Sequence, residues 1–529
     1  IPPTIMPTDV VMTAPTVNVV TENVGTVPFA VTDLPDYSQT NIQVAGVDEA
    51  DIVKTDGTYL YVVSNNSLFI LKAYPPKAAE ILSIIGFNGT LEEIFLKRNK
   101  LVILGSSATY PYESYYKMPT IINDKTFVNV YDVSNRSNPV LTRNFSVSGN
   151  YFDSRMINEY IYLVVSQSAY LIYDTLVLPK IYSREGVEEI GASEIYYANV
   201  SDYSYAFTTV AAINIQDDAQ KPTHETFLLG ATSCMYVSLN NIYITFWRQS
   251  GMTLLYRIRI EDEVIKSEAS GEVPGSVLNQ FSMDEYKGYF RLAITAWTDG
   301  TSQNKVYVLD MNLAAVGKLE NIAPGETIYS VRFMGDRGYV VTFRQVDPFF
   351  AIDLQDPYSP KVLGVLKIPG YSSYLHPYDE NHIIGIGKDG SFVKISLFDV
   401  SNVTDQKEIG NYTVIGEWSD SLVLSDHKAL LFNSSKNLLV MPITTSDYNV
   451  SKGTYVYWQG AYVFNITLEG IVLRGQITHA ENAGDLDYYQ SACHVKRALY
   501  MGDVLYTISD KKVMMHNLET LDEINQIEF

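Results

Sequence analysis

A segment of four short predicted strands that recurs along almost the whole chain limits what this protein can fold into more than any other feature. Residues 324–368 show it: PGETIYSVRFMGDRGYVVTFRQVDPFFAIDLQDPYSPKVLGVLKI. Alternating apolar and polar residues, with Gly, Asp and Pro at each break, divide this segment into TIYSVRFM, YVVTFRQ, FFAIDL and KVLGVLKI. Repeats of 40–50 residues are typical of tandem repeat architectures, so a single ordinary core is excluded.

The third strand of the repeat carries a signature in which an aliphatic residue precedes Asp and a turn. Clear copies are VNVYDVSNRSNPVL (128–141), VYVLDMNLAAVGKL (306–319) and ISLFDVSNVTDQKEI (395–409). Counting each copy with its two preceding strands gives units that begin near residues 47, 87, 150, 231, 273, 324, 369, 416 and 479. We therefore predict an all-β fold, a β-propeller of four-stranded antiparallel blades. Nine units are counted, and eight blades are the alternative because propellers usually have about four to eight.

Two regions do not follow the repeat. Residues 1–40 alternate Pro breaks with strand-like runs such as TVNVVTEN, and we expect an extended N-terminal arm ahead of a propeller at 41–529. Because the arm has no core of its own, it should lie against this propeller or against a neighbouring subunit. Residues 166–211 are expected to be an insertion between strands of the third unit.

Composition and sequons indicate an exported protein. A net charge of −22 with only 38 Lys and Arg argues against nucleic acid or an anionic membrane surface as partners. The chain has no run of eighteen apolar residues, so no membrane span is expected, and its start at Ile1 suggests that a leader has been removed. Ten Asn-x-Ser/Thr sequons favour a secreted, extracellular glycoprotein at the cell surface: Asn65, Asn88, Asn135, Asn144, Asn199, Asn402, Asn411, Asn433, Asn449 and Asn465.

Three long motifs carry a resemblance to a known family. They are NIQVAGVDEADIVKTDGTYLYVV (41–63), the block VRFMGDRGYVVTFRQVDPFFAIDLQDPYSPKVLGVLKIPGYSSYLHPYDENHIIGIG (331–387) and LSDHKALLFNSSKNLLVMPI (424–443). From about residue 36 to its end, the chain resembles secreted prokaryotic and archaeal proteins that contain a C-terminal β-propeller domain, distantly similar to WD40 repeats. The resemblance implies export and a propeller. It supplies no activity, substrate or cofactor.

The segment YSSYLHPYDENH (371–382) is the part of the chain that looks most like an enzyme site. First strands of propeller blades line the central channel. Aligning them predicts a set of channel-lining residues: Arg155, Arg332, His376, His427 and His494. His376, His427 and His494 would then form a zinc or anion site on adjacent strands about 4.8 Å apart. The alternative gives them water-filled channel positions or hydrogen bonds between blades.

Other candidate sites have competing structural explanations. Asp48, Glu49 and Asp51 in VDEAD could bind calcium, or could simply cap the first blade. Asp379, Glu380 and His382 are expected to serve turn chemistry. Cys234 and Cys493 should be free, buried thiols on distant inner strands. The tyrosine runs YPYESYY (110–116) and YYANVSDYSYAF (196–207) could contact sugar or protein, or pack at an edge.

The chain contains no serine-hydrolase, P-loop, CxxC, HExxH or CxxCH motif. We therefore expect a non-enzymatic surface or filament subunit without a cofactor, whose residues 1–40 contact a neighbour by self-association or bind another surface protein. One alternative is an exported metal-dependent enzyme or ligand-binding propeller that uses zinc or calcium at His376, Asp379, Asp426, His427 and His494. Another is a carbohydrate-binding module that uses the tyrosine-rich loops.

Overall fold

The computed structural model describes residues 35–109, 123–172, 175–197, 205–344, 347–451, 453–481 and 491–529. The chain divides into two compact units, Ile1–Leu34 and Pro35–Phe529, and the second is described here. Residues 35–40, which the prediction assigned to the arm, lie in this second unit. The first 34 residues of the arm, the YPYESYY run and Asn199 lie outside the described residues. No described helix is long and apolar enough to cross a membrane.

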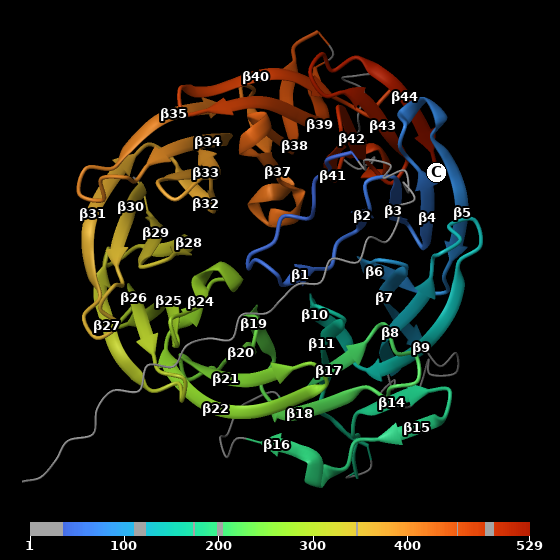
Figure 1. The fold of residues 1–529 in the computed structure, drawn as a ribbon. Helices are drawn as coiled ribbons and strands as arrows, with labels where there is room; N and C mark the ends of the chain where they lie inside the picture. The colour runs from blue at the N-terminus through green and yellow to red at the C-terminus, as the bar shows by residue number, and fades with distance from the viewer. Residues whose placement is uncertain are drawn as a thin grey trace, which may run out of the picture. The chain divides into compact units, whose positions relative to one another are not determined.

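The described residues of this unit form nine antiparallel blades that follow one another around a ring (Figure 1). Blades one to three are β2 to β5 (Val53–Thr55, Tyr59–Ser64, Ser67–Lys72, Glu80–Gly86), β6 to β9 (Thr90–Lys97, Lys100–Thr109, Asn123–Asp132, Val140–Ser148), and β10, β11, β17 and β18 (Asn150–Ile157, Tyr160–Ser168, Ala206–Asn214, Thr223–Leu229). Blades four to six are β19 to β22 (Thr232–Val237, Asn241–Trp247, Met252–Glu261, Val264–Pro274), β23 to β27 (Ser276–Val277, Met283–Tyr286, Tyr289–Thr298, Thr301–Leu309, Ala315–Ile322), and β28 to β31 (Thr327–Met334, Arg337–Phe343, Asp347–Asp353, Lys361–Ile368). Blades seven to nine are β32 to β35 (Tyr371–Pro377, His382–Asp389, Phe392–Asp399, Lys407–Thr413), β36 to β40 (Trp418–Asp420, Leu431–Asn433, Leu438–Asn449, Thr454–Thr467, Gly470–Ile477), and β41 to β44 (Arg497–Met501, Val504–Ile508, Lys512–Asn517, Glu523–Glu528).

The predicted propeller is confirmed, and the blade count is nine rather than eight. The only helical turns among the described residues are short 3-10 helices, at Pro76–Ala78, Ala192–Glu194, Gln280–Ser282, Leu422–Leu424, His427–Ala429, Ser434–Lys436 and Ser491–Cys493.

Neighbouring blades pack through a repeated feature of the outermost strand. The register between the third and fourth strands slips by one residue, as between Ala351 and Ile352 of blade six, and a glycine follows the slip on the outer strand. At Gly364 a Cβ atom would lie 2.1 Å from the carbonyl oxygen of Val403, which is in the next blade's turn. Gly317 meets Pro357 in the same way, also at 2.1 Å. The glycine therefore lets the backbone of one blade sit directly on the next.

The ring closes without any exchange of strands between its ends. All four strands of blade nine come from the C-terminus, and all four of blade one come from residues 53–86. Asn525 Nδ2 in β44 donates to the Pro76 carbonyl of blade one at 2.8 Å, and the rings of Phe69 and Phe529 lie 4.5 Å apart. Side-chain contacts thus replace the shared blade that would otherwise hold the two ends together.

The insertion in the third unit carries short strands of its own: β12 (Leu171–Ile172), β13 (Thr175–Leu176), β14 (Lys180–Ser183), β15 (Gly186–Glu189) and β16 (Ile195–Tyr197). β14 pairs with β9, the outer strand of blade two, and β15 pairs with β14. β16 pairs in parallel with β18, the outer strand of blade three. The insertion therefore widens two blades at their outer edges.

Residues 37–52, which we call the channel segment, run through the centre of the ring (Figure 1) and meet the blades in descending order. Tyr37 bridges to Met501 of blade nine, and Asn41 Nδ2 donates to the His427 carbonyl of blade eight and the Tyr374 hydroxyl of blade seven. Further along, the Gln43 carbonyl accepts from Arg332 of blade six, and the Gln43 side-chain amide donates to the Gln280 carbonyl of blade five. Val44 packs against the hydrophobic cluster that contains Tyr236 of blade four. The short strand β1 (Asp48–Glu49) pairs with β10 of blade three, and Asp51 bridges to Ile94 of blade two. The channel segment thus contacts blades nine to two from inside the ring.

Both cysteines are free, and both are half-buried rather than fully buried. Cys234 lies on the inner strand β19 as expected, whereas Cys493 ends a short 3-10 helix rather than lying on a strand. Burial raises the pKa of the Cys234 thiol to about 11. It is therefore protonated and unreactive at neutral pH.

Candidate functional site at the channel

The acidic motif VDEAD places two carboxylates inside the ring. Glu49 and Asp51 are each only 3% exposed. Buried carboxylates are costly unless they are paired and hydrogen-bonded. Their partners therefore decide whether the channel is a reactive site or a structural one.

Glu49 is the centre of the first network. Its Oε2 atom lies 3.0 Å from His427 Nε2 and 3.6 Å from Arg155 Nη2, and its Oε1 accepts from the Gln43 amide at 2.9 Å. Burial alone would raise the pKa of Glu49, but the charges of Arg155 and His427 and these hydrogen bonds hold it well below the usual range. Glu49 is therefore ionised and fixed between blades three and eight.

Asp51 belongs to a second network that joins blades eight and nine. Arg497 Nε donates to Asp51 Oδ1 at 2.8 Å, and Arg497 Nη2 donates to Asp426 Oδ2 at 2.5 Å. Burial would lower the pKa of Arg497, but the two carboxylates raise it above its ordinary value. One guanidinium thus holds two acids from distant parts of the chain.

Two lysines complete the set of buried cations. Lys428 contacts Glu93 and donates to the Ala50 carbonyl at 3.0 Å. Burial would lower the pKa of Lys428, but Glu93 and the other nearby carboxylates raise it. Lys54 donates to Asp48 Oδ1 at 2.8 Å and to Thr40 Oγ1 at 2.9 Å. Each cation ties the channel segment to a blade or to itself.

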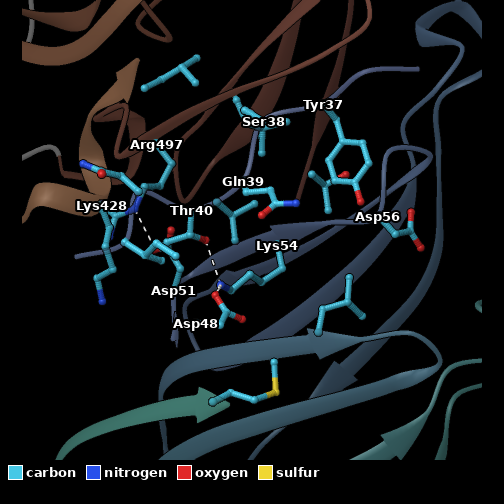
Figure 2. A pocket seen from close by; sticks show the side chains of 18 of the residues that line it. Tyr37, Ser38, Gln39, Thr40, Asp48, Asp51, Lys54, Asp56, Lys428 and Arg497 are labelled. Atoms are coloured by element: carbon cyan, nitrogen blue, oxygen red, sulfur yellow. Dashed lines mark hydrogen bonds and ion pairs between the residues drawn. The ribbon is translucent and has the colours of Figure 1, made fainter. Parts of the chain in front are cut away.

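A cavity of about 620 Å³ opens beside the channel segment, between it and blades one, two, three, eight and nine. Figure 2 shows Lys54 between Thr40 and Asp48, and Arg497 beside Asp51, at its wall. Lys54, Lys428 and Arg497 all line this cavity, and each already faces a carboxylate. Part of the cavity wall is therefore charged, but the charges of these three cations are already compensated.

The predicted channel residues are only partly brought together. Arg155 and His427 meet at Glu49, and Arg332 Nη2 donates to the Gln43 carbonyl at 3.4 Å. His376 Nδ1 lies 3.1 Å from the Tyr374 hydroxyl. His427 and His494 are not on inner strands as predicted: His427 begins a 3-10 helix capped by Asp426, and His494 follows another. At His427, Asp426 accepts from the Lys428 amide, so a short polar residue that bonds nearby backbone replaces the expected strand there.

The three histidines do not gather into a metal cluster. In the parts of the chain that the structure describes, no group of three or more His, Cys, Asp or Glu side chains could hold a metal ion. The carboxylates proposed for calcium are bound by cations: Asp48 by Lys54, Glu49 by Arg155, and Asp51 by Arg497. Asp379 accepts from the Asn381 amide and lies 2.8 Å from His382 Nδ1, in the turn before β33.

The sequence analysis did not identify Lys428, Glu93 and Arg497 as parts of one network. Each belongs to a different blade, so no local motif joins them. The available signal was charge complementarity, since three acids in VDEAD need buried cations, and RALYM (497–501) and HKA (427–429) supply two of them. Asn41 and Gln43 lie in the motif NIQVAGVDEAD (41–51), but nothing else in the sequence indicated that they contact the channel.

The lowered pKa values of two histidines, His479 and His376, predict how the free energy of unfolding changes with pH. His479 is fully buried, with its ring nitrogens 2.8 Å from the hydroxyls of Ser509 and Thr507. Burial, with the charges of Lys512 and His516, lowers its pKa to about 3, and burial beside Arg332 and His427 does the same for His376. The folded state therefore resists protonation that the unfolded chain, with a histidine pKa near 6.5, accepts.

The free energy of unfolding is therefore not reduced by these histidines above about pH 6.5. As the pH drops from 6.5 toward 3, it falls by about 1.4 kcal/mol per pH unit for each such histidine. Thermal melts between pH 7 and 4 should show this slope, and His479→Gln should make it shallower. An unchanged slope in the variant would contradict the assignment of His479.

The fold and the site define a class of protein: a nine-bladed propeller whose channel holds a segment of its own chain, with the charges in the channel paired. The sequence matches the family described as "Beta propeller domain" over residues 37–521, and the chain belongs to that family. A protein of Methanocaldococcus jannaschii, described as uncharacterized, is 31% identical over 93% of this chain and 83% of its own length. An uncharacterized protein of Archaeoglobus fulgidus is 28% identical over 94% of this chain and 86% of its own length. A solved structure from Lactobacillus plantarum aligns with a TM-score of 0.35 and 12% identity, covering 63% of this chain and 94% of that one.

Proposed function

We propose that this protein is a non-enzymatic, glycosylated, secreted β-propeller that serves as a subunit of a cell-surface assembly, and that its N-terminal residues contact a neighbouring subunit. The observation that carries the proposal is the occupied channel. Catalytic acids and bases must exchange protons near the working pH. Glu49 and Asp51 are instead bound to Arg155, His427 and Arg497. The outer surface and the N-terminal arm are then the parts free to act.

The residues that directly follow the arm support the proposal. Asp36 accepts from the Gly502 amide at 2.7 Å, and Ser38 donates to the Tyr500 carbonyl at 3.0 Å, so the chain is anchored to blade nine from this point. All nine blades have their four strands from residues beyond 52. The described strands of the nine blades therefore include none of residues 1–34.

The proposal is tested by the assembly state of the purified protein. The intact chain should self-associate in sedimentation velocity and electron microscopy, and removal of residues 1–34 should abolish the association while leaving the thermal melt unchanged. An arm-deleted protein that assembles like the intact chain would refute the proposal.

Sequon positions give a second prediction for an exported protein. Six of the described sequons have exposed asparagines: Asn65, Asn88, Asn135, Asn144, Asn402 and Asn411. Asn433 is half-buried, and its Nδ2, the atom that would carry a glycan, donates to the Tyr500 hydroxyl at 2.7 Å. Glycopeptide mass spectrometry of the native protein should find glycans among the six exposed sites and none at Asn433. A glycan at Asn433, or none at all six, would contradict this prediction.

Carbohydrate binding is a second candidate function, favoured by exposed tyrosines in the insertion. Tyr197 is 74% exposed, and Tyr196 is 49% exposed and stacks on Phe227. Exposed aromatic rings of this kind can stack on sugar rings. A glycan array should then show binding that Tyr197→Ala reduces, and an array without any hit would exclude this candidate.

A further inference from the structure

The outer edges of the blades differ in how they are protected. Among the described residues, β14 and β15 cover the outer edge of blade two, and β16 covers that of blade three. In the parts of the chain that the structure describes, the outer strands of the other seven blades have no further partner. Such an edge presents unpaired backbone N–H and C=O groups, which can pair with a strand of another molecule unless charges or covering elements prevent it.

Most of the seven open edges carry charges that discourage pairing. Lys or Arg lies within β22 (Lys266), β27 (Lys318), β31 (Lys361 and Lys367), β35 (Lys407) and β40 (Arg474). β44 has a Glu near each end and Asn525 and Gln526 in its middle. Lysine on an edge strand is a common protection against unwanted strand addition.

β5 of blade one lacks this protection. Its sequence is EILSIIG, so its only charge is on its first residue, Glu80. The five residues from Ile81 to Ile85 are uncharged, four of them are aliphatic, and Ile84 is 58% exposed. An apolar, uncharged and open edge strand is typical of a strand-addition site.

We propose that β5 accepts residues 16–21 of a second copy of this chain as an added strand. This inference rests on the proposed function and names the surface that the arm would use. Residues 16–21 read TVNVVT, in which five of six residues are β-branched, and the whole run 10–21 is uncharged. Their length suits β5, which has seven residues.

The geometry of the arm permits the contact. The propeller unit begins at Pro35, beside blades nine and one: a Cβ added at Gly502 of blade nine would lie 3.4 Å from both Pro35 Cβ and the Tyr74 hydroxyl. Residues 22–34 can then span at most about 45 Å. An arm from one copy and an edge on the next give a head-to-tail contact, which builds rings or open filaments.

The test compares two exposed aliphatic residues on open outer strands of the full chain. Ile84→Lys places a charge on β5, and Val472→Lys places the same charge on β40, where Val472 is 62% exposed. We expect Ile84→Lys to weaken self-association at least tenfold in sedimentation, and Val472→Lys to change it less than twofold. Thermal melts of both variants should stay within a few degrees of the wild type.

A cross-linking experiment identifies the partner. A full chain with Val19→Cys is mixed with a differently tagged chain with Ile84→Cys, and oxidation should link the two chains. The control is a chain that carries both Val19→Cys and Ile84→Cys. If a disulfide forms only within this chain and never between two chains, the proposal is overturned, because the arm then binds its own blade.

A further variant of the full chain, Val17→Asp/Val19→Asp, separates this inference from the function beneath it. If this variant loses assembly while Ile84→Lys keeps it, the arm acts at another surface and β5 is not the acceptor. If Val17→Asp/Val19→Asp assembles normally, residues 16–21 are not the added strand, whereas the proposed function itself fails only if the protein without residues 1–34 assembles normally.

Discussion

Arg497→Met is expected to lower the free energy of unfolding by about 3–5 kcal/mol, the usual cost of removing one partner from a buried ion pair. Arg497 is 5% exposed and is bonded to both Asp51 and Asp426. Methionine keeps much of the side-chain volume. The lost free energy of unfolding therefore measures the effect of leaving the two carboxylates without the Arg497 guanidinium. Chemical denaturation at pH 7 followed by circular dichroism measures it.

The matched control is Arg259→Met, which breaks a pair with Glu261 at the surface. Arg259 is 48% exposed and Glu261 is 65% exposed, so this pair should contribute less than about 1 kcal/mol. The stability difference between the Arg497 variant and the wild type should also narrow at low pH, because protonation of a buried carboxyl group that has lost its cation removes an unpaired charge. Equal losses in the two variants would show that the Arg497 network does not stabilise the ring.

Gly364→Ala is expected to destabilise the protein by about 3 kcal/mol or more, the upper end of what overpacking costs. The new Cβ would lie 2.1 Å from the Val403 carbonyl oxygen. That oxygen is backbone in the turn of the next blade, so no side chain can rotate away. Blades six and seven would have to separate. Thermal unfolding of the purified variant measures the effect.

Gly86→Ala is the control within the same kind of strand. Gly86 ends β5, and nothing lies within 4 Å of its added Cβ. Its backbone is not left-handed, so alanine should be neutral or slightly stabilising through the unfolded chain. If both substitutions have the same effect, close packing at the glycine of each outer strand is not what sets the distance between blades.

Much of the propeller could be predicted because its information is local. The expected strands TIYSVRFM and KVLGVLKI coincide with β28 and β31, since period-two alternation and turn residues act within a few positions. The 3-10 helices at His427 and Ser491 were missed for a related reason. They replace inner strands where short polar residues bond their own backbone, and a repeat alignment carries strand character across such breaks.

The channel network could not be predicted, because its members meet only in the closed ring. Glu49 and His427 are 378 positions apart, and Asp51 and Arg497 are 446 apart. The sequence indicated that VDEAD is unusual, and inner-strand alignment placed Arg155 near the channel. Which cation meets which acid depends on the path of the channel segment, and that path has no repeated counterpart elsewhere in the chain.

The descending order in which the channel segment meets the blades has a consequence for folding. Residues 37–52 are made before all the strands of the nine blades, yet Tyr37 and Ser38 pair with residues 501 and 500 of blade nine. Closing so long a loop is slow because its entropy must be paid before the contact forms. Each blade, by contrast, is built from neighbouring hairpins and can form as it is synthesised. The channel segment is therefore made before the blades but can complete its contacts only after blade nine has formed.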